Sequence, residues 1–398
     1  MDIIIGIIVG LLVLMFLIVA HEFGHFIAAR RNGVKVKEFG ICFPPRAIAW
    51  QKGKDGKWHR LPKSKWKKPD NDSLILSLNW IPIGGFCAMD GESDADTKKG
   101  TFGATTFWQK TKILFAGVAM NWLVAFVILT ILALTGLPKF IDNQFSIDAD
   151  AHVDAKPVAV ASVQENSPAA TAGFQVGDLI TSINGQEVTT GTEIIDYDNQ
   201  HPGQKLDFTV IRDDESITLS PTLNNTDSEY LLGISMSTSQ TLTRYTWSAP
   251  IVGAATTVQL TGETFRGLGV LVWNLCSGIA SQFNPDDAVR EQGRTAIGAA
   301  GDSVSGPVGI IGTIFPAFTA SGPTNLAFLA ALISVALACM NVLPIPALDG
   351  GRWLLIAIFK LRKKKLTKET EEKIVGRAFL VLLALIILIT ILDITKFF

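Results

Sequence analysis

The chain of 398 residues is 48% hydrophobic and only 18% charged, and its mean hydropathy of +0.33 is too high for an ordinary soluble protein. The near-balance of 35 basic and 36 acidic residues excludes a basic nucleic-acid-binding protein, and the apolar content excludes a disordered chain. Four scattered cysteines form neither a metal-binding pair nor a disulfide framework. The composition therefore indicates an integral membrane protein.

Four apolar stretches are candidates for membrane-spanning helices, because crossing a hydrocarbon core of about 30 Å takes roughly 20 helical residues. Residues 3–20, 113–137 and 326–348 are long enough, and residues 378–392 are shorter but uninterrupted. The first stretch has no basic residue before it and no clean cleavage site after it, so we expect a retained span rather than a signal peptide. Residues 250–279 could form either an amphipathic helix on the membrane surface or a buried core helix.

The distribution of Lys and Arg predicts how these spans are oriented. Residues 30–112 hold 17 basic and 8 acidic residues, and residues 360–377 hold 8 basic and 3 acidic residues, so both segments are expected on the cytoplasmic side. Residues 138–325 hold 8 basic and 21 acidic residues. We expect this long segment, and both chain termini, outside the cytoplasm.

The outer segment contains a compact module at residues 157–223. The short runs VAVASV, DLITSING, KLDFTVI and SITLSPTL predict β-strands, and SPAATAGF and GTEIIDYDN predict two short helices. The stretch SPAATAGFQVGDLITSINGQEV resembles a bacterial PDZ domain, with Gly173, Gly177 and Gly185 in its turns. Such a domain binds an extended peptide as an added strand; a spacer domain without a ligand is the alternative.

The first span ends in the motif HEFGH at residues 21–25. His21 and His25 are four residues apart and so lie one helical turn apart on one face, where both can bind one Zn²⁺ with Glu22 beside the open coordination position. A carboxylate within an apolar span costs about 3 kcal/mol on insertion scales, which favours a functional role. The alternative is that His21 and Glu22 only mark the membrane interface and hydrogen-bond to a neighbouring helix.

A catalytic zinc ion usually has three protein ligands and one open position, so two histidines are not enough. His59, His152 and His201 lie in a basic loop and in the outer segment, and are expected at the surface. Asp349, in the stretch NVLPIPALDGG, is an isolated carboxylate at the inner end of the third apolar stretch, where two prolines break the helix. We therefore predict that Asp349 is the third ligand.

HEFGH, NVLPIPALDGG and the intervening PDZ-like stretch together resemble the site-2 protease family of intramembrane zinc metalloproteases, in particular its bacterial regulator-of-sigma-E type. IPIGGFCAMDGE at residues 81–92 resembles the membrane-dipping β element of that family, AGVAMN at residues 116–121 resembles its second-span motif, and SGPVGI at residues 305–310 resembles the approach to its third span. Val118 stands where the family motif AGPxxN has proline.

The resemblance implies a polytopic α-helical membrane protein with about four transmembrane helices, a membrane-dipping β element and one inserted extracytoplasmic PDZ domain of α+β type. The implied spans are residues 1–30, 113–137, 326–351 and 378–396. On the cytoplasmic side lie the loop with the β element at 31–112 and a basic loop at 352–377. Residues 138–245 form the extracytoplasmic region with the PDZ core at 157–223, and residues 246–325 form an amphipathic or linker region. Residues 59–72 and 284–302 are expected insertions without an assigned role.

The implied activity is hydrolysis of a peptide bond in or near the membrane segment of a single-span protein, such as an anti-sigma factor or a signal-peptide remnant, already cut once by another protease. The enzyme would lie in the bacterial inner membrane, with its active site near the cytoplasmic side and a peptide bound to its PDZ domain. The implied site comprises His21, His25 and Asp349 as ligands of Zn²⁺, Glu22 as the general base, and Asn341, Gly84, Gly85 and Phe86 as substrate-positioning residues.

Two functions of other classes stay open on the sequence alone. A membrane-tethered PDZ scaffold without catalysis explains the spans and the outer module, but not HEFGH and LDG. A transporter that uses intramembrane His, Glu and Asp explains those residues, but neither the PDZ-like stretch nor the order of the HExxH motif. Stoichiometric zinc in the purified protein disfavours the scaffold, and ion flux in proteoliposomes without peptide cleavage would indicate the transporter.

Overall fold

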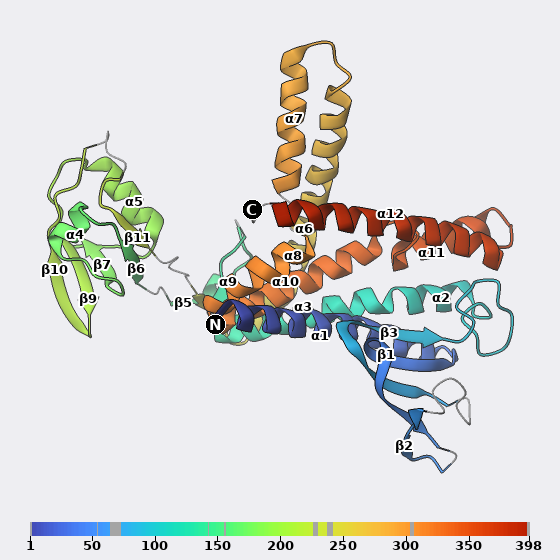
Figure 1. The fold of residues 1–398 in the computed structure, drawn as a ribbon. Helices are drawn as coiled ribbons and strands as arrows, with labels where there is room; N and C mark the ends of the chain where they lie inside the picture. The colour runs from blue at the N-terminus through green and yellow to red at the C-terminus, as the bar shows by residue number, and fades with distance from the viewer. Residues whose placement is uncertain are drawn as a thin grey trace. The chain divides into compact units, whose positions relative to one another are not determined.

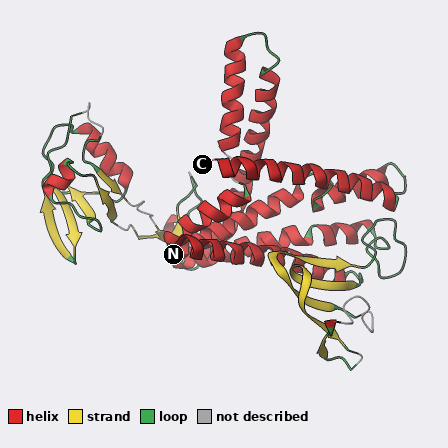
Figure 2. Cartoon of the chain, in the orientation of Figure 1, coloured by secondary structure: helices red, strands yellow, loops and turns green. Residues whose placement is uncertain are grey.

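The computed structural model of the protein describes residues 2–53, 55–63, 73–141, 143–154, 157–225, 230–236, 242–302 and 306–395. Contacts divide the chain into two compact units, the first formed by Met1–Thr130 with Gly253–Phe398 and the second by Ile131–Val252. The first unit is mainly helical with one β-sheet, and the second is mainly β-structure (Figures 1 and 2). Most of the expected insertion at residues 59–72 lies outside the described residues.

Four helical segments are long and apolar enough to cross a membrane, and they coincide with the four predicted apolar stretches: Ile3–Arg31, Phe107–Thr135, Pro323–Val342 and Lys368–Ile391. They belong to α1 (Asp2–Arg31), to α2 (Phe107–Leu114) followed by α3 (Ala116–Thr135), to α10 (Pro323–Val342) and to α12 (Lys368–Thr395). These helices run in the same general direction in Figure 1. The chain is therefore a polytopic helical membrane protein.

Two predicted boundaries are wrong. The second helical segment begins earlier than residue 113, because Thr106 and Gln109 form a capping box that starts α2 at Phe107. The third segment ends earlier than residue 348, because the chain leaves the helix at Leu343 (φ −58°, ψ 147°), immediately before Pro344. Asp349 instead begins a separate helix, α11 (Asp349–Leu361), and α11 together with the start of α12 makes most of the expected basic loop at residues 352–377 helical.

The region 246–325, expected to be an amphipathic segment or linker, is mostly helical. It consists of α6 (Ala249–Ser281), α7 (Asp287–Asp302), α8 (Pro307–Gly309), the π-helical turn η3 (Ile310–Ile314) and α9 (Phe315–Ala320). Helices α6 and α7 form an antiparallel pair in Figure 1. Within the first unit α9 packs closely against α1, since a Cβ on Gly10 would lie 2.6 Å from the ring of Phe315.

The sheet of the first unit contains β1 (Val36–Lys52), β2 (Trp58–Arg60) and β3 (Ile75–Met89) in the antiparallel order β2-β1-β3. Residues 38–41 of β1 pair with residues 75–78 of β3 on one side and with residues 85–88 on the other, so β3 bends back and its two halves flank the first half of β1. Gly84 permits this bend, because its φ is +86° and a Cβ there would lie 2.6 Å from the ring of Phe43. Among the described strands, residues 85–89 pair only with β1 and leave one edge open.

The second unit confirms the strands and helices predicted for residues 157–223. Its main sheet has the order β10-β9-β7-β6-β11, with β8 beside β7, and it is accompanied by α4 (Pro168–Ala172) and α5 (Gly191–Gln200). The strands are β6 (Val158–Val163), β7 (Leu179–Ile183), β8 (Gln186–Glu187), β9 (Phe208–Arg212), β10 (Glu215–Leu219) and β11 (Ile234–Met236). The module thus extends beyond residue 223, because β11 pairs with β6 and Leu232 is buried in its core.

Two further features stabilise the second unit. A small sheet joins its ends through β4 (Leu137–Pro138), β12 (Leu242–Arg244) and β5 (His152–Asp154), and a short 3₁₀ turn, η2 (Asp148–Asp150), precedes β5. In the main module Asp178 is buried and accepts two hydrogen bonds from Arg212, at 2.6 and 2.7 Å. Burial raises the pKa of the Asp178 carboxyl, but the hydrogen bonds from Arg212 and from the Gln175 amide, together with the charge of Arg212, hold the pKa below its usual value.

Candidate active site

Three ligand atoms meet where the inner part of α1 faces the first residue of α11. His21 Nε2 lies 3.1 Å from Asp349 Oδ2, His25 Nε2 lies 3.3 Å from the same oxygen, and the two Nε2 atoms are 3.1 Å apart. His21 and His25 are 8% and 7% exposed, and the Asp349 side chain is 20% exposed. The structure thus brings together the three residues that the sequence proposed as ligands, although 328 positions separate His21 from Asp349.

The spacing of these atoms fits a zinc ion. Ligands that bind zinc at about 2.0–2.1 Å in a tetrahedral arrangement lie about 3.3 Å from one another, close to the three observed separations. Gly117 of α3 leaves the space beside them open, because a Cβ there would lie 2.5 Å from His25 Nε2 and 2.6 Å from His21 Nε2. Two imidazoles, one carboxylate and this glycine form a cradle of suitable size and chemistry for Zn²⁺.

The two glycines after Asp349 explain how it reaches α1. A Cβ on Gly350 would lie 2.1 Å from the carbonyl oxygen of Val342, and a Cβ on Gly351 would lie 2.0 Å from that of Ile345. Only glycine therefore allows the connection after α10 to fold tightly beneath the start of α11. This close approach places the Asp349 carboxylate opposite the two imidazoles.

Neighbouring groups hold both imidazoles through their Nδ1 atoms. His25 Nδ1 lies 2.8 Å from the carbonyl oxygen of Ile113, so it carries the hydrogen and leaves Nε2 free to bind a metal. His21 Nδ1 lies 3.4 Å from the side-chain amide of Asn121, which is fully buried. Asn121 Oδ1 has no hydrogen-bond partner among the described residues. Turned through 180°, the amide of Asn121 accepts the hydrogen of His21 Nδ1.

Asn121 was not assigned a role by the sequence analysis, which placed it only within the motif AGVAMN. The signal that could have found it is a lone amide in an otherwise apolar helix, since intramembrane polar residues usually have a specific partner. Its own backbone is fixed from the other side, because Ser334 Oγ of α10 donates to the Asn121 carbonyl at 2.8 Å. Asn121 is therefore placed to orient His21 rather than to contact a substrate.

We expect Asn121→Leu to weaken zinc binding by about 10- to 100-fold, the usual effect of losing a group that orients a ligand. The substitution keeps an apolar side chain of similar size in the helix, so only the partner of His21 is lost. Zinc affinity measured by competition with a chelator checks this. The control is Ser334→Ala, which alters the packing of Asn121 but leaves His21 its partner; an equal loss of zinc in both variants would contradict the role of the amide.

Glu22 lies between the ligand cluster and the open edge of β3. Its carboxyl is close to His21, His25 and Asp349, and it also approaches the backbone amide of Cys87. Cys87 is buried on β3 and is not among the three residues whose ligand atoms meet. Among the described residues, Glu22 is thus the one carboxylate that lies close to the three ligand residues without being one of them.

The predicted substrate-positioning residues divide into two groups. Gly84, Gly85 and Phe86 lie on β3 next to α1, and a Cβ on Gly85 would lie 3.3 Å from Val19 Cγ2, two residues before the HEFGH motif. Asn341 lies in the last turn of α10, and its side chain makes no hydrogen bond to the three ligand residues within the described part of the chain. The glycine-rich strand thus lies beside the helix that carries the motif, whereas no described hydrogen bond joins Asn341 to the ligand residues.

A polar cavity of about 910 Å³ connects the ligand cluster with the surface. Asp349 lies on its wall, together with Asp90, Glu92, Lys98 and Arg352. Glu371 of α12 fixes this wall, accepting hydrogen bonds from the Asp94 backbone at 2.9 Å and from Arg352 Nε at 3.3 Å. The cavity gives water a route to a site that is otherwise enclosed by apolar helices.

Buried ligands with zinc spacing, a neighbouring carboxylate and a water-accessible cavity among membrane helices define a membrane-embedded, metal-dependent hydrolase. The model of peptidase family M50 matches residues 9–61 and 66–386. The chain belongs to this family, and it is an intramembrane zinc metalloprotease of the kind that acts in regulated proteolysis. Family membership decides against the scaffold and the transporter.

Curated relatives match the chain over almost its whole length. It is 28% identical to the regulator of sigma-W protease RasP of Bacillus subtilis, over 93% of this chain and 94% of the relative. It is 27% identical to the zinc metalloprotease RasP of Bacillus licheniformis, again over 93% and 94%. Among solved structures, the PDZ domain of an SdrC-like protein from Listeria monocytogenes is 28% identical with a TM-score of 0.20, covering 21% of this chain and 92% of that domain.

Proposed function

We propose that the protein hydrolyses a peptide bond within or near the membrane segment of single-span membrane proteins, with His21, His25 and Asp349 as the zinc ligands. The convergence of these three side chains at zinc spacing, at the inner end of an apolar helix, carries the proposal. Purified protein in proteoliposomes, incubated with a single-span substrate, tests it. We expect product masses that place the cut in the membrane segment; cleavage confined to soluble loops would contradict it.

Glu22 is the general base of this mechanism. His21, His25 and Asp349 would hold a zinc ion, which when bound would supply a Lewis acid for the scissile carbonyl and lower the pKa of water toward neutrality. The Glu22 carboxylate takes a proton from the attacking water and then donates it to the nitrogen of the departing amine, so one proton is transferred and the peptide bond is replaced by an acid and an amine. His21 and His25 stay oriented throughout by Asn121 and the Ile113 carbonyl.

The open edge of β3 at residues 85–89 provides a surface for an unwound substrate. Strand edges expose backbone N–H and C=O groups that can pair with an extended peptide. This edge approaches Glu22 at Cys87, so a peptide paired there passes the general base. Gly85 and Phe86 belong to the same edge and are proposed to position the substrate, with Asn341 as a weaker candidate.

Substrates with helix-breaking residues near the cut should be cleaved faster, because a membrane helix hides its peptide groups in i to i−4 hydrogen bonds. Replacing one such Gly by Leu favours the helix by about 1 kcal/mol, and replacing Pro by Leu favours it by about 3 kcal/mol. We expect about fivefold slower cleavage for the first change and a larger effect for the second, measured as initial rates in proteoliposomes. The same substitutions at the far end of the segment are the control; equal rates for all variants would contradict an unwinding step.

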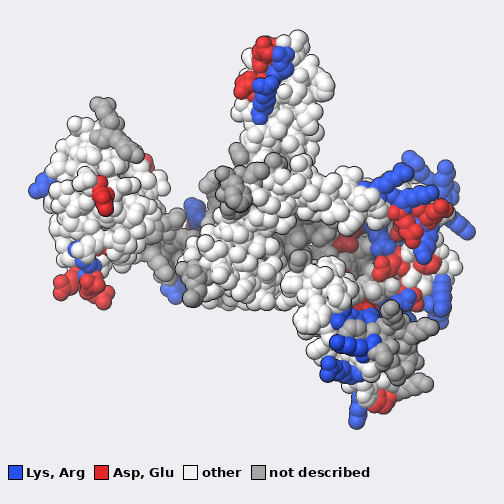
Figure 3. All heavy atoms as spheres, in the orientation of Figure 1, with Lys and Arg blue, Asp and Glu red and all other residues white. Residues whose placement is uncertain are grey.

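The basic residues support a cytoplasmic position for the active-site end of the helices. Figure 3 shows Lys and Arg, mixed with Asp and Glu, gathered around the ends of α11 and α12 and over the sheet of β1 and β3, whereas the surface of the long helices away from these ends is largely uncharged. By the positive-inside rule this end faces the cytoplasm. We propose that the protein lies in the bacterial inner membrane, with the zinc site near its cytoplasmic side and the second unit outside the cytoplasm.

Labelling of introduced cysteines tests this orientation. Of the four native cysteines only Cys276 is exposed, so the test uses a Cys276→Ser background. A membrane-impermeant thiol reagent should label Gln186→Cys in intact cells, or in spheroplasts where an outer envelope intervenes. It should label Lys57→Cys only after the membrane is broken. The reverse pattern would contradict the orientation.

The second unit is proposed to act as a peptide-binding PDZ domain. Its sheet has an edge strand, β11, to which an extended peptide can add by backbone hydrogen bonds. The name of the Bacillus subtilis relative, a regulator of sigma-W protease, suggests an anti-sigma factor as the substrate class; a signal-peptide remnant is the alternative. In both cases a prior cut by another protease would remove a large outer domain before the segment enters the site.

A further inference from the structure

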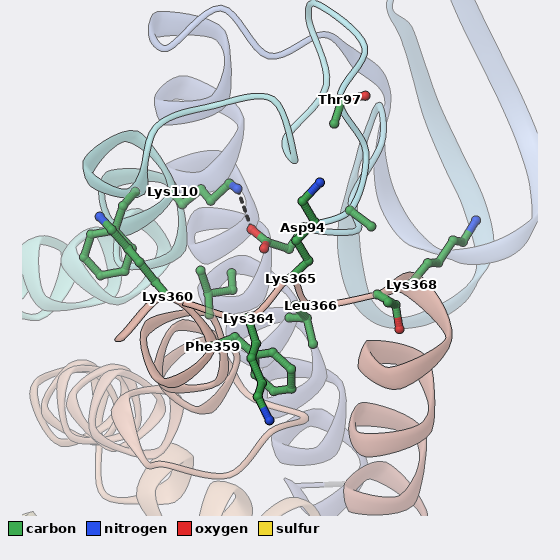
Figure 4. A pocket seen from close by; sticks show the side chains of 13 residues that line it. Asp94, Thr97, Lys110, Phe359, Lys360, Lys364, Lys365, Leu366 and Lys368 are labelled. Atoms are coloured by element: carbon green, nitrogen blue, oxygen red, sulfur yellow. Dashed lines mark hydrogen bonds and ion pairs between the residues drawn. The ribbon is translucent and has the colours of Figure 1, made fainter. Parts of the chain in front are cut away.

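A second pocket, of about 520 Å³, lies at the inner ends of the helices and contains none of the zinc ligands (Figure 4). Helix α2 contributes Phe107 and Lys110 to one wall of the pocket, and helix α11 contributes Phe359 and Lys360. The connection from α11 to α12 completes this wall. The loop that follows β3 closes the other side with Asp94 and Thr97. Three helices and a loop therefore share one pocket that the proteolytic mechanism does not use.

The lining of this pocket is strongly cationic with an apolar base. Five lysines face one carboxylate, that of Asp94, which is paired with Lys110: the lysines are Lys110, Lys360, Lys364, Lys365 and Lys368. The other four lysines are exposed, so four positive charges remain around the pocket. In Figure 4 their side chains spread around its rim, while Phe359 and Leu366 lie between them.

The pocket lies at the ends of two helical segments that are long and apolar enough to cross a membrane. It is bounded by the first turn of α2 and by the start of α12, which are the ends of two membrane-spanning segments. Trp108 beside it is 71% exposed, and Leu361 at the end of α11 is 83% exposed. An exposed Trp next to a row of lysines is typical of the membrane–water interface, where the ring rests among headgroups and the ammonium groups face phosphate.

We propose that this pocket binds an anionic phospholipid, with the headgroup phosphate among Lys360, Lys364 and Lys365 and the upper part of an acyl chain against Phe359 and Leu366. Basic pockets between membrane helices select anionic headgroups, and each Lys near the surface contributes to that attraction. The apolar base and the interfacial depth favour a lipid over a soluble phosphate, which gains nothing from Phe359 and Leu366.

The site bears on the protease through one helix. Helix α11 begins at Asp349 and ends at Leu361, so its first residue belongs to the zinc cluster and its last turn lines the lipid pocket. Lys368 lines both this pocket and the polar cavity at the zinc site. A bound lipid therefore anchors the helix that carries Asp349, although the binding itself does not depend on the proposed catalytic roles.

The test counts bound lipid on the full-length protein by native mass spectrometry. Detergent-purified protein is incubated with equal amounts of dioleoyl phosphatidylglycerol and dioleoyl phosphatidylcholine. We expect about tenfold preferential retention of phosphatidylglycerol by the wild-type protein, and a loss of about tenfold in the variant Lys360→Gln/Lys364→Gln/Lys365→Gln, because three headgroup contacts disappear together. Failure of the wild-type protein to prefer phosphatidylglycerol would overturn the proposal.

A charge-matched control separates a site from general attraction. The variant Lys57→Gln/Arg60→Gln/Lys63→Gln also removes three positive charges, from exposed positions outside the pocket, and should retain phosphatidylglycerol like the wild-type protein. Equal loss in both variants, or no loss in the pocket variant, would overturn the proposal. Displacement of the lipid by excess inorganic phosphate would also do so, since it would indicate a soluble anion. Two further measurements exclude misfolding as the cause of lipid loss. The triple pocket variant should keep the zinc content of the wild-type protein, and the single variant Lys364→Gln should show an intermediate loss of phosphatidylglycerol.

Discussion

Glu22→Gln is expected to keep a full equivalent of zinc and to lower the rate of substrate cleavage by about 10²- to 10⁴-fold, the usual contribution of a positioned general base. The amide has almost the size of the carboxylate, so the packing between α1 and β3 is retained. It cannot accept a proton from water at neutral pH. Zinc content by elemental analysis and cleavage of a single-span substrate in proteoliposomes, measured on the same preparation, check both halves of this expectation.

The control for this variant is Glu369→Gln, which makes the same chemical change at an exposed position in the first turn of α12. It should cleave at the wild-type rate, because an exposed carboxylate that pairs with Lys373 at 3.4 Å contributes little to stability and nothing to the reaction. Wild-type cleavage by Glu22→Gln would remove Glu22 from the mechanism. Loss of zinc from Glu22→Gln would instead make Glu22 a metal ligand.

Asp349→Ala is expected to abolish cleavage. It should also weaken zinc affinity by more than the loss of a residue that only orients a ligand, which costs about 10- to 100-fold. The reason is geometric: Asp349 supplies one of three protein ligands, and its oxygen is the only carboxylate atom in the described cluster. His21→Ala should behave in the same way. Competition with a chromophoric chelator measures the affinity, and the proteoliposome assay measures the activity.

The control for Asp349→Ala is Asp393→Asn, another buried carboxylate of the same unit. Asp393 accepts a hydrogen bond from the Gly309 amide at 2.9 Å and so fixes α12 to the last residue of α8. Its replacement should lower thermal stability, because the Gly309 amide loses a charged partner, and leave zinc affinity unchanged. Normal zinc affinity in Asp349→Ala would contradict the third-ligand assignment, whatever its effect on stability.

The zinc cluster could be predicted because its parts leave local marks in the sequence. Two histidines at i and i+4 share a helical face by the geometry of the helix alone, and an isolated carboxylate in an apolar stretch requires an explanation. The helix that presents Asp349 was predicted incorrectly, since Asp349 was expected at the end of the third apolar stretch. Hydropathy continues smoothly across residues 343–348, whereas the chain turns there because two prolines and the close approach of Gly350 and Gly351 start a new helix.

The residues around the ligands could not be predicted, because they depend on how helices rotate against one another. Gly117 and Asn121 lie on α3, and an apolar helix with almost no amphipathic pattern gives no indication of which face meets α1. The contact between α1 and α3 becomes visible only in the structure, where a Cβ on Gly24 would lie 2.3 Å from the carbonyl oxygen of Ala116. The same limit applies to β3, whose open edge arises because the strand bends and both its halves pair with β1, which its alternating sequence does not reveal.

X-ray absorption at the zinc K-edge of the purified, full-length protein tests the central claim most directly. The account predicts one zinc ion per chain, bound by two imidazole nitrogens and by oxygen at about 2.0–2.2 Å, with no sulfur ligand. The Asp349→Ala variant, loaded with excess zinc, should lose the carboxylate contribution and keep the imidazole signals. A zinc–sulfur distance of about 2.3 Å, or a protein that binds no zinc in active form, would contradict the account.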